Sequence, residues 1–309
     1  MGILDLLEEQ ICGSKDKWTH IAILNKGKVR YYIARDSSAK KNLVKTLSSY
    51  SVKHNLFSNL INLVPICVLS KVNKANFVKL NLDKRIENFI NKNVIKNKYS
   101  YNVIIGTYGE HQKIVIQLFN ETGIRYCKIG NENTAKQMNA EIEFLKCSNL
   151  KEFKTLELPT YVNSYRIDGI NMLITKEFNG EKVYPNLNGA IYELFKEVIS
   201  IKRSIVNKNG STMTFSHGDF APWNMRKEGK KIIIFDWEYC GMRFYGFDII
   251  HYSYEIQKLL NGKDHCDALE IAIKEAKKKD ENLRHITDDK LTELYEEEYK
   301  KTFGNMILI

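Results

Sequence analysis

The sequence lacks the features that mark membrane-spanning, secreted and metal-knuckle proteins. No run of eighteen or more apolar residues occurs, which excludes a typical transmembrane helix. The start, MGILDLLEE, carries acids where a signal peptide carries positive charge, and Leu6 stands where a myristoylation signal has Ser or Thr. No two of the six cysteines are close enough in sequence for a zinc knuckle or a redox motif. We therefore expect a cytoplasmic protein with reduced thiols and no stable membrane anchor.

Positive charge is abundant but is not gathered into a recognisable patch. The formal net charge is +10, yet the lysines are scattered, and basic residues do not alternate with aromatic ones on any one segment. No nucleic-acid partner is therefore expected. With 43% hydrophobic residues, the 309-residue chain can bury a substantial core divided between about two lobes. Composition leaves the oligomeric state open.

The most informative stretch is SHGDFAPWN, residues 216–224, which Asp236 follows twelve residues later after the apolar run IIIF. Transfer of a phosphoryl group from a nucleotide needs a carboxylate that orients the attacking hydroxyl, and oxygen ligands that hold Mg²⁺ on the phosphates. Asp219 can supply the carboxylate, and Asn224 and Asp236 can supply the metal ligands. In the alternative interpretation, Asp219 and Asn224 are only turn formers, since both residue types favour loops. The pattern favours a phosphoryl-transfer site.

The residues between Asn224 and Asp236 predict a hairpin that folds one metal ligand toward the other. Residues 224–226 and 231–235 would be its strands, joined by a polar turn that contains a glycine. If Asn224 lies opposite a residue near Ile233, Asp236 is about 10 Å further along the strand, at roughly 3.3 Å per residue. One or two metal ions could span that gap.

The spacing His-Gly-Asp, four residues, Asn, and then an aspartate after an apolar strand resembles the aminoglycoside phosphotransferase and choline kinase superfamily, relatives of the protein kinases. That superfamily has glycine where the protein-kinase catalytic loop has arginine, and Asp236-Trp237-Glu238 fits its variant of the later Asp-Phe-Gly triplet. The resemblance covers residues 101–260. It implies a two-lobed, protein-kinase-like α+β fold with an antiparallel-sheet nucleotide lobe and a mainly helical C-terminal lobe. The domains expected are an accessory N-terminal region (1–98), a nucleotide-binding lobe (99–178) and a catalytic and substrate lobe (179–309).

A kinase-like site requires a glycine loop upstream of this motif. Residues 101–105 and 113–119 are predicted to be strands on either side of Gly106-Thr107-Tyr108-Gly109. Two glycines let the backbone approach phosphates and point its amides at them. Taken alone, the same spacing is also typical of an ordinary hairpin turn. With the downstream motif, we predict that Gly106, Thr107 and Gly109 bind the nucleotide.

A kinase also places a phosphate-pairing lysine on the third strand, which residues 124–129 are predicted to form. Lys128 is therefore our choice, and Lys113, which begins the second strand, is the alternative. Apolar residues at three- and four-residue spacing predict a helix over residues 134–148. Glu141 lies near the buried stripe of this helix, at about 100° per residue. We expect Glu141 to pair with Lys128; a solvated position on the helix flank is the alternative.

Residues 159–165 and 171–177 are predicted to complete a five-stranded antiparallel lobe, with a turn at Asp168-Gly169. The segment Glu177-Phe178-Asn179-Gly180 follows. It resembles the hinge where main-chain atoms hydrogen-bond the adenine base in the superfamily, so Glu177 and Phe178 are assigned to the nucleotide site.

The C-terminal lobe is predicted to contain a helix over residues 191–201 that leads to the motif, and another over residues 249–260. Asp248 is expected to cap the second helix, with a ligand-facing role as the alternative. His217 is expected to orient the catalytic loop rather than to transfer protons, because positioning and charge dominate phosphoryl transfer. His251 is expected to be packed or hydrogen-bonded.

The accessory region, residues 1–98, departs in length from a minimal aminoglycoside kinase. Residues 18–24 and 29–34 predict a hairpin, and Asp36-Ser37 can cap a helix that runs to Leu47. This region could present substrate, mediate dimerisation or stabilise the nucleotide lobe.

These features predict a small-molecule kinase that moves the terminal phosphate of ATP, or of GTP, to a hydroxyl, with Mg²⁺ as the metal. Its expected partners are the nucleotide triphosphate and a small-molecule acceptor. The superfamily favours a sugar, an amino alcohol or a saccharide intermediate, and the short segment between Asp236 and Gly246 argues against a protein substrate. The alternatives are an aminoglycoside antibiotic phosphotransferase and a nucleotide-binding pseudokinase scaffold. The presence of all three polar site residues argues against the scaffold.

Overall fold

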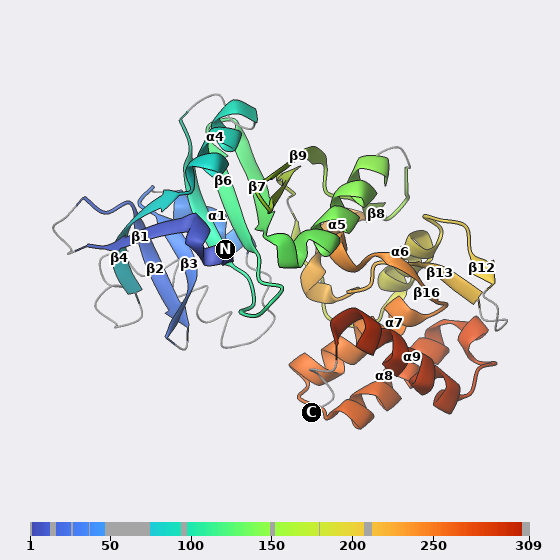
Figure 1. The fold of residues 1–309 in the computed structure, drawn as a ribbon. Coiled ribbons are helices and arrows are strands. Elements are labelled where there is room, and N and C mark those ends of the chain that lie inside the picture. Colours follow the sequence, from blue (N-terminus) through green and yellow to red (C-terminus); the bar gives the residue numbers. More distant parts are fainter. Residues whose placement is uncertain are drawn as a thin grey trace. The chain divides into compact units, whose positions relative to one another are not determined.

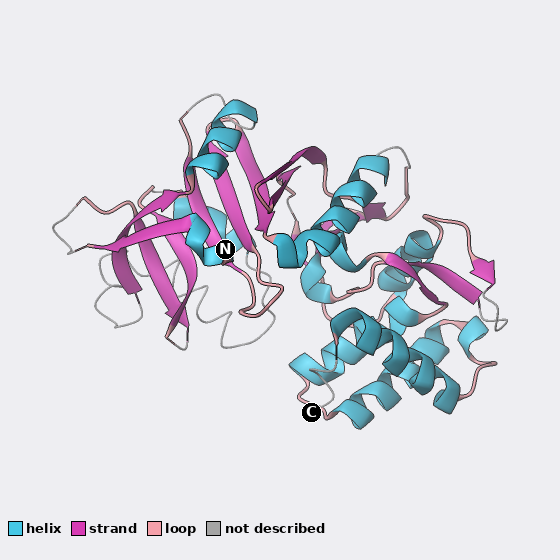
Figure 2. Ribbon diagram, viewed as in Figure 1, coloured by secondary structure: helices cyan, strands magenta, loops and turns pink. Residues whose placement is uncertain are grey.

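The computed structural model describes residues 2–12, 17–25, 27–36, 38–46, 75–93, 98–148, 152–178, 180–206 and 212–304. The chain divides into two compact units. The N-terminal unit comprises Met1–Ile142 and Thr160–Glu177, and the C-terminal unit comprises Glu143–Pro159 and Phe178–Ile309. Figures 1 and 2 show the helices and strands of both units.

A nine-stranded antiparallel sheet forms the N-terminal unit, in the order β1-β4-β2-β3-β5-β6-β7-β10-β9 (Figure 2). Its strands in chain order are β1 (Leu7–Ile11), β2 (His20–Asn25), β3 (Lys28–Ala34), β4 (Ala75–Leu82), β5 (Ser100–Ile105), β6 (Ile114–Asn120), β7 (Gly123–Gly130), β9 (Tyr161–Ile167) and β10 (Ile170–Lys176). The five strands predicted after residue 100 are present. The prediction of a five-stranded lobe is nevertheless too small, because β3 pairs with β5 and so joins β1 to β4 to the same sheet.

One hydrophobic core serves the whole sheet. In β6, Ile114, Ile116 and Leu118 are fully buried, since alternate residues of a strand face the same side. The same cluster includes apolar residues of β1, β4, β7 and β10 and of helix α4 (Lys84–Asn93). The expected accessory region therefore packs into the same core as the strands of the predicted nucleotide lobe.

The structure confirms the predicted N-terminal hairpin, whose strands are β2 and β3. Helix α1 (Ala39–Thr46) follows, and Asp36 Oδ1 accepts a hydrogen bond from the Ser38 amide at 2.8 Å just before it. Ser37, the other residue of the predicted cap, and Leu47, the predicted helix end, lie outside the described residues.

The C-terminal unit contains two small sheets, in the orders β11-β14-β15-β8 and β12-β13-β16 (Figure 1). The strands are β8 (Leu156–Glu157), β11 (Glu181–Lys182), β12 (Ile205–Val206), β13 (Thr212–Ser216), β14 (Met225–Glu228), β15 (Lys231–Ile234) and β16 (Gly241–Phe244). The helices are α6 (Gly189–Ile199), α7 (Phe247–Glu255), which continues as a π-helix over Ile256–Leu260, α8 (His265–Lys279) and α9 (Asp288–Phe303). Helix α5 (Ala135–Ser148) crosses the division between the units.

The fold is thus a mixed α+β fold with a sheet-rich N-terminal unit and a mainly helical C-terminal unit, as predicted. The predicted helices are confirmed as α5, as α6, and as α7 with its π-helical end. Within the described ranges, every helix is too short or too polar to cross a membrane.

Candidate functional site

Asp248 holds the loop that carries the catalytic motif. Its carboxylate accepts hydrogen bonds from the Ser216 hydroxyl at 2.6 Å, the His217 amide at 2.7 Å and the Gly218 amide at 3.1 Å. The prediction that Asp248 caps a helix is wrong, because Gly246 precedes α7 and Asp248 lies inside its first turn. The carboxylate instead ties the helix to the loop after β13.

Gly218 is required by this geometry. Its φ is +89°, and a Cβ at this position would lie 2.2 Å from the Tyr239 carbonyl oxygen. A side chain would therefore meet both backbone strain and a steric clash. The loop passes so close to the segment after β15 that only glycine fits between its histidine and its aspartate.

Two neighbours fix the Asp219 carboxylate. The Asn224 Nδ2 donates to Asp219 Oδ2 and to the Asp219 carbonyl, both at 2.9 Å. The His251 Nε2 lies 3.2 Å from Asp219 Oδ1. The Asp219 side chain remains 24% exposed, whereas that of His251 is 1% exposed. An oriented carboxylate that solvent still reaches is suited to accept a hydrogen bond from a hydroxyl group.

His251 forms the floor of this arrangement. Its Nδ1 lies 2.9 Å from the hydroxyl of Tyr295, a fully buried residue of α9. Burial lowers the pKa of His251, but the hydrogen bond to Asp219 and the nearby carboxylates of Glu255, Asp219 and Asp248 outweigh it and raise the pKa above its usual value. In the protonated form, both ring nitrogens donate, one to Asp219 and the other to Tyr295.

His217 is a neutral spacer between the loop and β15. Complete burial lowers the pKa of His217, although the charges of Asp248, Asp219 and Asp236 and the hydrogen bond to Phe235 act in the opposite direction. Its Nδ1 accepts from the Asp219 amide at 3.2 Å, and its Nε2 lies 3.1 Å from the Phe235 carbonyl oxygen. One neutral tautomer, with the proton on Nε2, satisfies both contacts.

The hairpin after the motif is tighter than predicted. β14 and β15 pair Met225 with Ile234 and Glu228 with Lys231, which leaves a two-residue turn with Gly229 at φ +59°. The Phe235 amide donates to the Asn224 carbonyl at 3.0 Å. Asn224 therefore lies opposite Phe235 rather than near Ile233, and Asp236 is the next residue along the chain.

Asp236 occupies the left-handed region of the backbone map, with φ 70° and ψ 53°. Few residues other than glycine adopt this conformation, and such residues gather at functional sites. Asp236 precedes the short 3-10 helix Trp237–Tyr239 without capping it through its side chain. Trp237, fully buried, packs edge-on against His217 with ring centroids 4.5 Å apart. With Asn224 Nδ2 committed to Asp219, the oxygen donors of this hairpin are Asn224 Oδ1 and the Asp236 carboxylate, the type of ligand that Mg²⁺ prefers.

In the N-terminal unit, the predicted glycine loop connects β5 and β6. The Gly106 amide donates to the Lys113 carbonyl at 2.8 Å, and a Cβ on Gly106 would lie 2.6 Å from that same oxygen. Gly109 has φ +156°. Within the described part of the chain, no hydrogen-bond acceptor is found for the amides of Thr107 and Gly109. The loop therefore has backbone donors that an anion could engage.

Lys128 and Glu141 form the ion pair that the sequence predicts. Lys128 Nζ on β7 lies 2.7 Å from Glu141 Oε2 on α5, and their side chains are only 16% and 5% exposed. The alternative of a solvated Glu141 is therefore wrong. Lys113 is also buried, but its backbone is committed to the base of the glycine loop.

The predicted hinge coincides with the division between the units, which falls between Glu177 and Phe178. The Glu177 amide donates to the Ile124 carbonyl at 3.2 Å. Phe178 stacks on Phe235 with ring centroids 4.8 Å apart, beside the metal-ligand candidate Asp236. Asn179 lies outside the described residues.

Two residues near these groups were missed by sequence reasoning. Glu255 on α7 is buried, and burial, with the nearby charge of Asp219, raises its pKa to about 7. Its position one helical turn after His251 was the available signal. Arg30 on β3 donates to the Gly106 carbonyl at 2.6 Å, and no local pattern links residues 76 apart in sequence.

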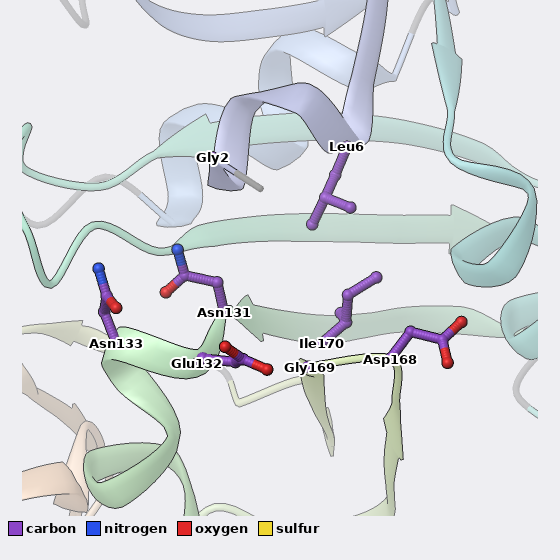
Figure 3. A pocket seen from close by; sticks show the side chains of 8 residues that line it. All are labelled: Gly2, Leu6, Asn131, Glu132, Asn133, Asp168, Gly169 and Ile170. Carbon is purple, nitrogen blue, oxygen red and sulfur yellow. The ribbon is translucent and has the colours of Figure 1, made fainter.

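A cavity of about 230 Å³ in the N-terminal unit lies apart from all of these groups (Figure 3). Its lining combines the first residues of the chain, the segment before α5 and the β9–β10 turn: Gly2, Leu6, Asn131, Glu132, Asn133, Asp168, Gly169 and Ile170. Arg85 reaches Asp168 at 3.4 Å. None of the predicted site residues lines this cavity.

Comparison with known proteins gives one family match. The family described as choline/ethanolamine kinase matches residues 133–298, more than half of the chain. No curated protein sequence matches.

Solved structures of similar fold include three kinases of small molecules. The amicoumacin kinase hAmiN, in complex with AMP-PNP, Ca²⁺ and Ami, has a TM-score of 0.39 and 11% identity, over 66% of this chain and 89% of that one. The aminoglycoside phosphotransferase APH(4)-Ia has a TM-score of 0.45 and 9% identity, over 64% and 83%. APH(2")-IIa, in a ternary complex with streptomycin and ATP, has a TM-score of 0.42 and 17% identity, over 74% and 99%.

Proposed function

Because the chain belongs to the choline/ethanolamine kinase family and is therefore a small-molecule kinase, we propose that it moves the terminal phosphate of ATP, or less readily of GTP, to the hydroxyl of an amino alcohol. The observation that carries this proposal is the Asp219 carboxylate, which Asn224 and His251 hold in one orientation while it stays accessible. We place this reaction in the cytoplasm.

Asp219 is the residue that orients the acceptor. Its carboxylate accepts the hydrogen bond of the attacking hydroxyl and takes up the proton as the new bond to phosphorus forms. His251, on the other carboxylate oxygen, keeps the side chain from rotating away. His217 is neutral and fully occupied by backbone groups, so it holds the loop and does not exchange protons with the acceptor.

On the nucleotide side, we assign the backbone of Gly106, Thr107 and Gly109 to the phosphates. The Lys128 ammonium pairs with the phosphates while Glu141 fixes its position. Main-chain atoms at Glu177 and Phe178 receive the base. The support for these assignments is the loop conformation, the buried ion pair and the location of the hinge.

The oxygen atoms of Asn224 and Asp236 suit a hard divalent cation, and we propose Mg²⁺. When bound, the cation neutralises charge on the phosphates. The left-handed backbone at Asp236 and the two hydrogen bonds of Asn224 Nδ2 direct these oxygen donors.

The acceptor class follows from the side chains next to Asp219. Glu255 supplies a second carboxylate, and its charge contributes to the raised pKa values of the buried residues Tyr295 and Tyr299. Tyr254 and Tyr295 also pack together, with ring centroids 5.3 Å apart. Carboxylates and aromatic rings attract an ammonium group, whereas a neutral sugar gains nothing from either charge. An amino alcohol fits this neighbourhood better than a sugar.

The test is transfer of label from γ-labelled ATP or GTP, with Mg²⁺, to choline, ethanolamine, neutral sugars and aminoglycosides. We expect label on an amino alcohol and its loss in Asp219→Asn and Asp236→Asn. Asp168→Asn is the matched control, because Asp168 is the other described non-glycine residue with positive φ and is exposed in a turn. Acceptor-dependent transfer that survives both site substitutions contradicts the assignment. Nucleotide binding without transfer to any acceptor favours the scaffold alternative.

A further inference from the structure

The N-terminal hairpin is fastened to the glycine loop by side chains. Arg30 on β3 donates from Nη1 to the Gly106 carbonyl at 2.6 Å, and Gln112 Nε2 lies 3.4 Å from the same oxygen. The Tyr108 hydroxyl donates to the Val29 carbonyl at 2.6 Å, and Lys28 Nζ lies 4.6 Å from the centre of the Tyr108 ring. The loop is therefore held at two points by a strand that the family match, residues 133–298, does not cover.

The contact to Gly106 determines where the next amide points. The carbonyl of Gly106 and the N–H of Thr107 belong to one peptide unit, and no described peptide bond is cis. In a planar trans peptide the two groups point in opposite directions. Holding the carbonyl on Arg30 therefore aims the Thr107 N–H to the other side of the loop. The guanidinium charge also polarises this peptide, which makes the N–H a stronger donor.

We propose that Arg30 is a positioning residue for nucleotide binding, which it serves by orienting the Gly106–Thr107 peptide toward the phosphates. This inference rests on the proposed function, since it requires that the glycine loop binds a nucleotide. It also assigns a role to the first strands of the chain, which form the rigid support of the loop. Tyr108 supports the same loop from its centre through Val29.

The test compares the affinity for Mg²⁺·ADP and the KM values of the Arg30→Gln variant with those of the full-length wild-type protein. A charged hydrogen bond changes an equilibrium about tenfold or more, so we expect Arg30→Gln to raise the nucleotide Kd and KM about tenfold. The KM of the acceptor is expected to stay within about twofold, because Arg30 acts through the loop alone. Arg30→Lys, which keeps the charge, is expected to restore part of the affinity.

Arg35→Gln is the matched control. Arg35 follows β3, is exposed, and lies over the Trp18 ring at 4.7 Å without contact to the glycine loop. It is expected to bind the nucleotide like the wild type. Tyr108→Phe is expected to weaken nucleotide binding in the same direction as Arg30→Gln, and its fold is retained because the ring stays.

Two results would overturn the inference: Arg30→Gln binding the nucleotide as tightly as Arg35→Gln, or Arg30→Gln raising both KM values equally. Lys128→Met, measured alongside, separates this failure from failure of the proposed function. If the wild type binds nucleotide, Lys128→Met does not, and Arg30→Gln binds normally, only the role of Arg30 is refuted. If the wild type binds neither ATP nor GTP, the proposed function is refuted and the role of Arg30 with it.

Discussion

Substitution of Asp248 by Asn tests whether one buried carboxylate organises the catalytic loop. In the wild type, this side chain satisfies three donors of the loop and is 1% exposed. Asn retains one oxygen, but its amide group must then face a donor. If the oxygen stays with Ser216 and Gly218, the new NH₂ group opposes the His217 amide, which lies 2.7 Å from the present carboxylate.

The expected loss follows from these contacts. One hydrogen bond to a charged group contributes about 1.5–3 kcal/mol, and a buried donor left without an acceptor costs about 1–3 kcal/mol. We therefore expect the free energy of unfolding to fall by about 3–5 kcal/mol. A loop displaced by about 1 Å also misplaces Asp219, for which a loss of about 100-fold in transfer rate is typical.

Urea unfolding followed by tryptophan fluorescence measures the first effect, since Trp237 is buried against His217. Label transfer to the acceptor measures the second effect. Asp264→Asn is the matched control: Asp264 caps α8 by accepting from the Asp267 amide at 2.9 Å, and Asn caps helices about as well as Asp. A loss below about 1 kcal/mol for Asp248→Asn, together with an unchanged transfer rate, would refute the reasoning.

Two further predictions concern stability. Glu255 has a pKa of about 7 in the fold against an ordinary 4.5, so its contribution to stability is fully present below pH 4.5 and is lost as the pH rises through 7. The Glu255→Gln variant is therefore expected to gain about 2–4 kcal/mol relative to wild type between pH 5 and pH 8, with the exposed Glu270→Gln as control; equal pH dependence of all three proteins in denaturant titrations would contradict this. The Glu197 carboxylate accepts from the amides of Lys154, Thr155 and Leu156 at 2.5–3.0 Å. Glu197→Gln is expected to lower the unfolding free energy by about 1–3 kcal/mol, whereas Glu193→Gln on the same helix, whose ion pair is exposed, is expected to change it by less than about 0.5 kcal/mol; equal effects would show that the three amides do not depend on the charge.

Sequence reasoning succeeds where short-range rules set the geometry. The Lys128–Glu141 pair follows from strand alternation and helix periodicity, because these place one side chain of each element toward the other. The spacing of Asp219, Asn224 and Asp236 along one loop and one hairpin is also local. Both features are therefore readable from the order of residues alone.

The hairpin register shows the limit of local rules. A glycine within four polar residues predicts a four-residue turn, but Lys227 and Glu228 continue the strand and leave Gly229 and Lys230 as the turn. Lengthening the strands in this way moves the partner of Asn224 from Ile233 to Phe235. Turn length is the quantity that the sequence leaves open, since one glycine is compatible with either turn.

Long-range contacts are the other limit. Asp248 has the residue type and position of a helix cap, whereas its true partners lie about 30 residues earlier in the chain. Likewise, nothing in the sequence of β3 indicates that it joins β5 and supports the glycine loop. Such contacts depend on how the sheet is ordered, which composition and periodicity do not encode.

The central claim is that Asp219, held by Asn224 and His251, acts in the transfer step itself. The most direct measurement is a single-turnover rate of phosphate transfer from saturating Mg²⁺·ATP to an amino alcohol, for the wild type and for Asp219→Asn. The account predicts a nucleotide Kd within about twofold of wild type and a transfer rate lowered at least about 100-fold, the lower range expected for loss of a positioned general base. A transfer rate within about tenfold of wild type at unchanged nucleotide affinity would contradict it.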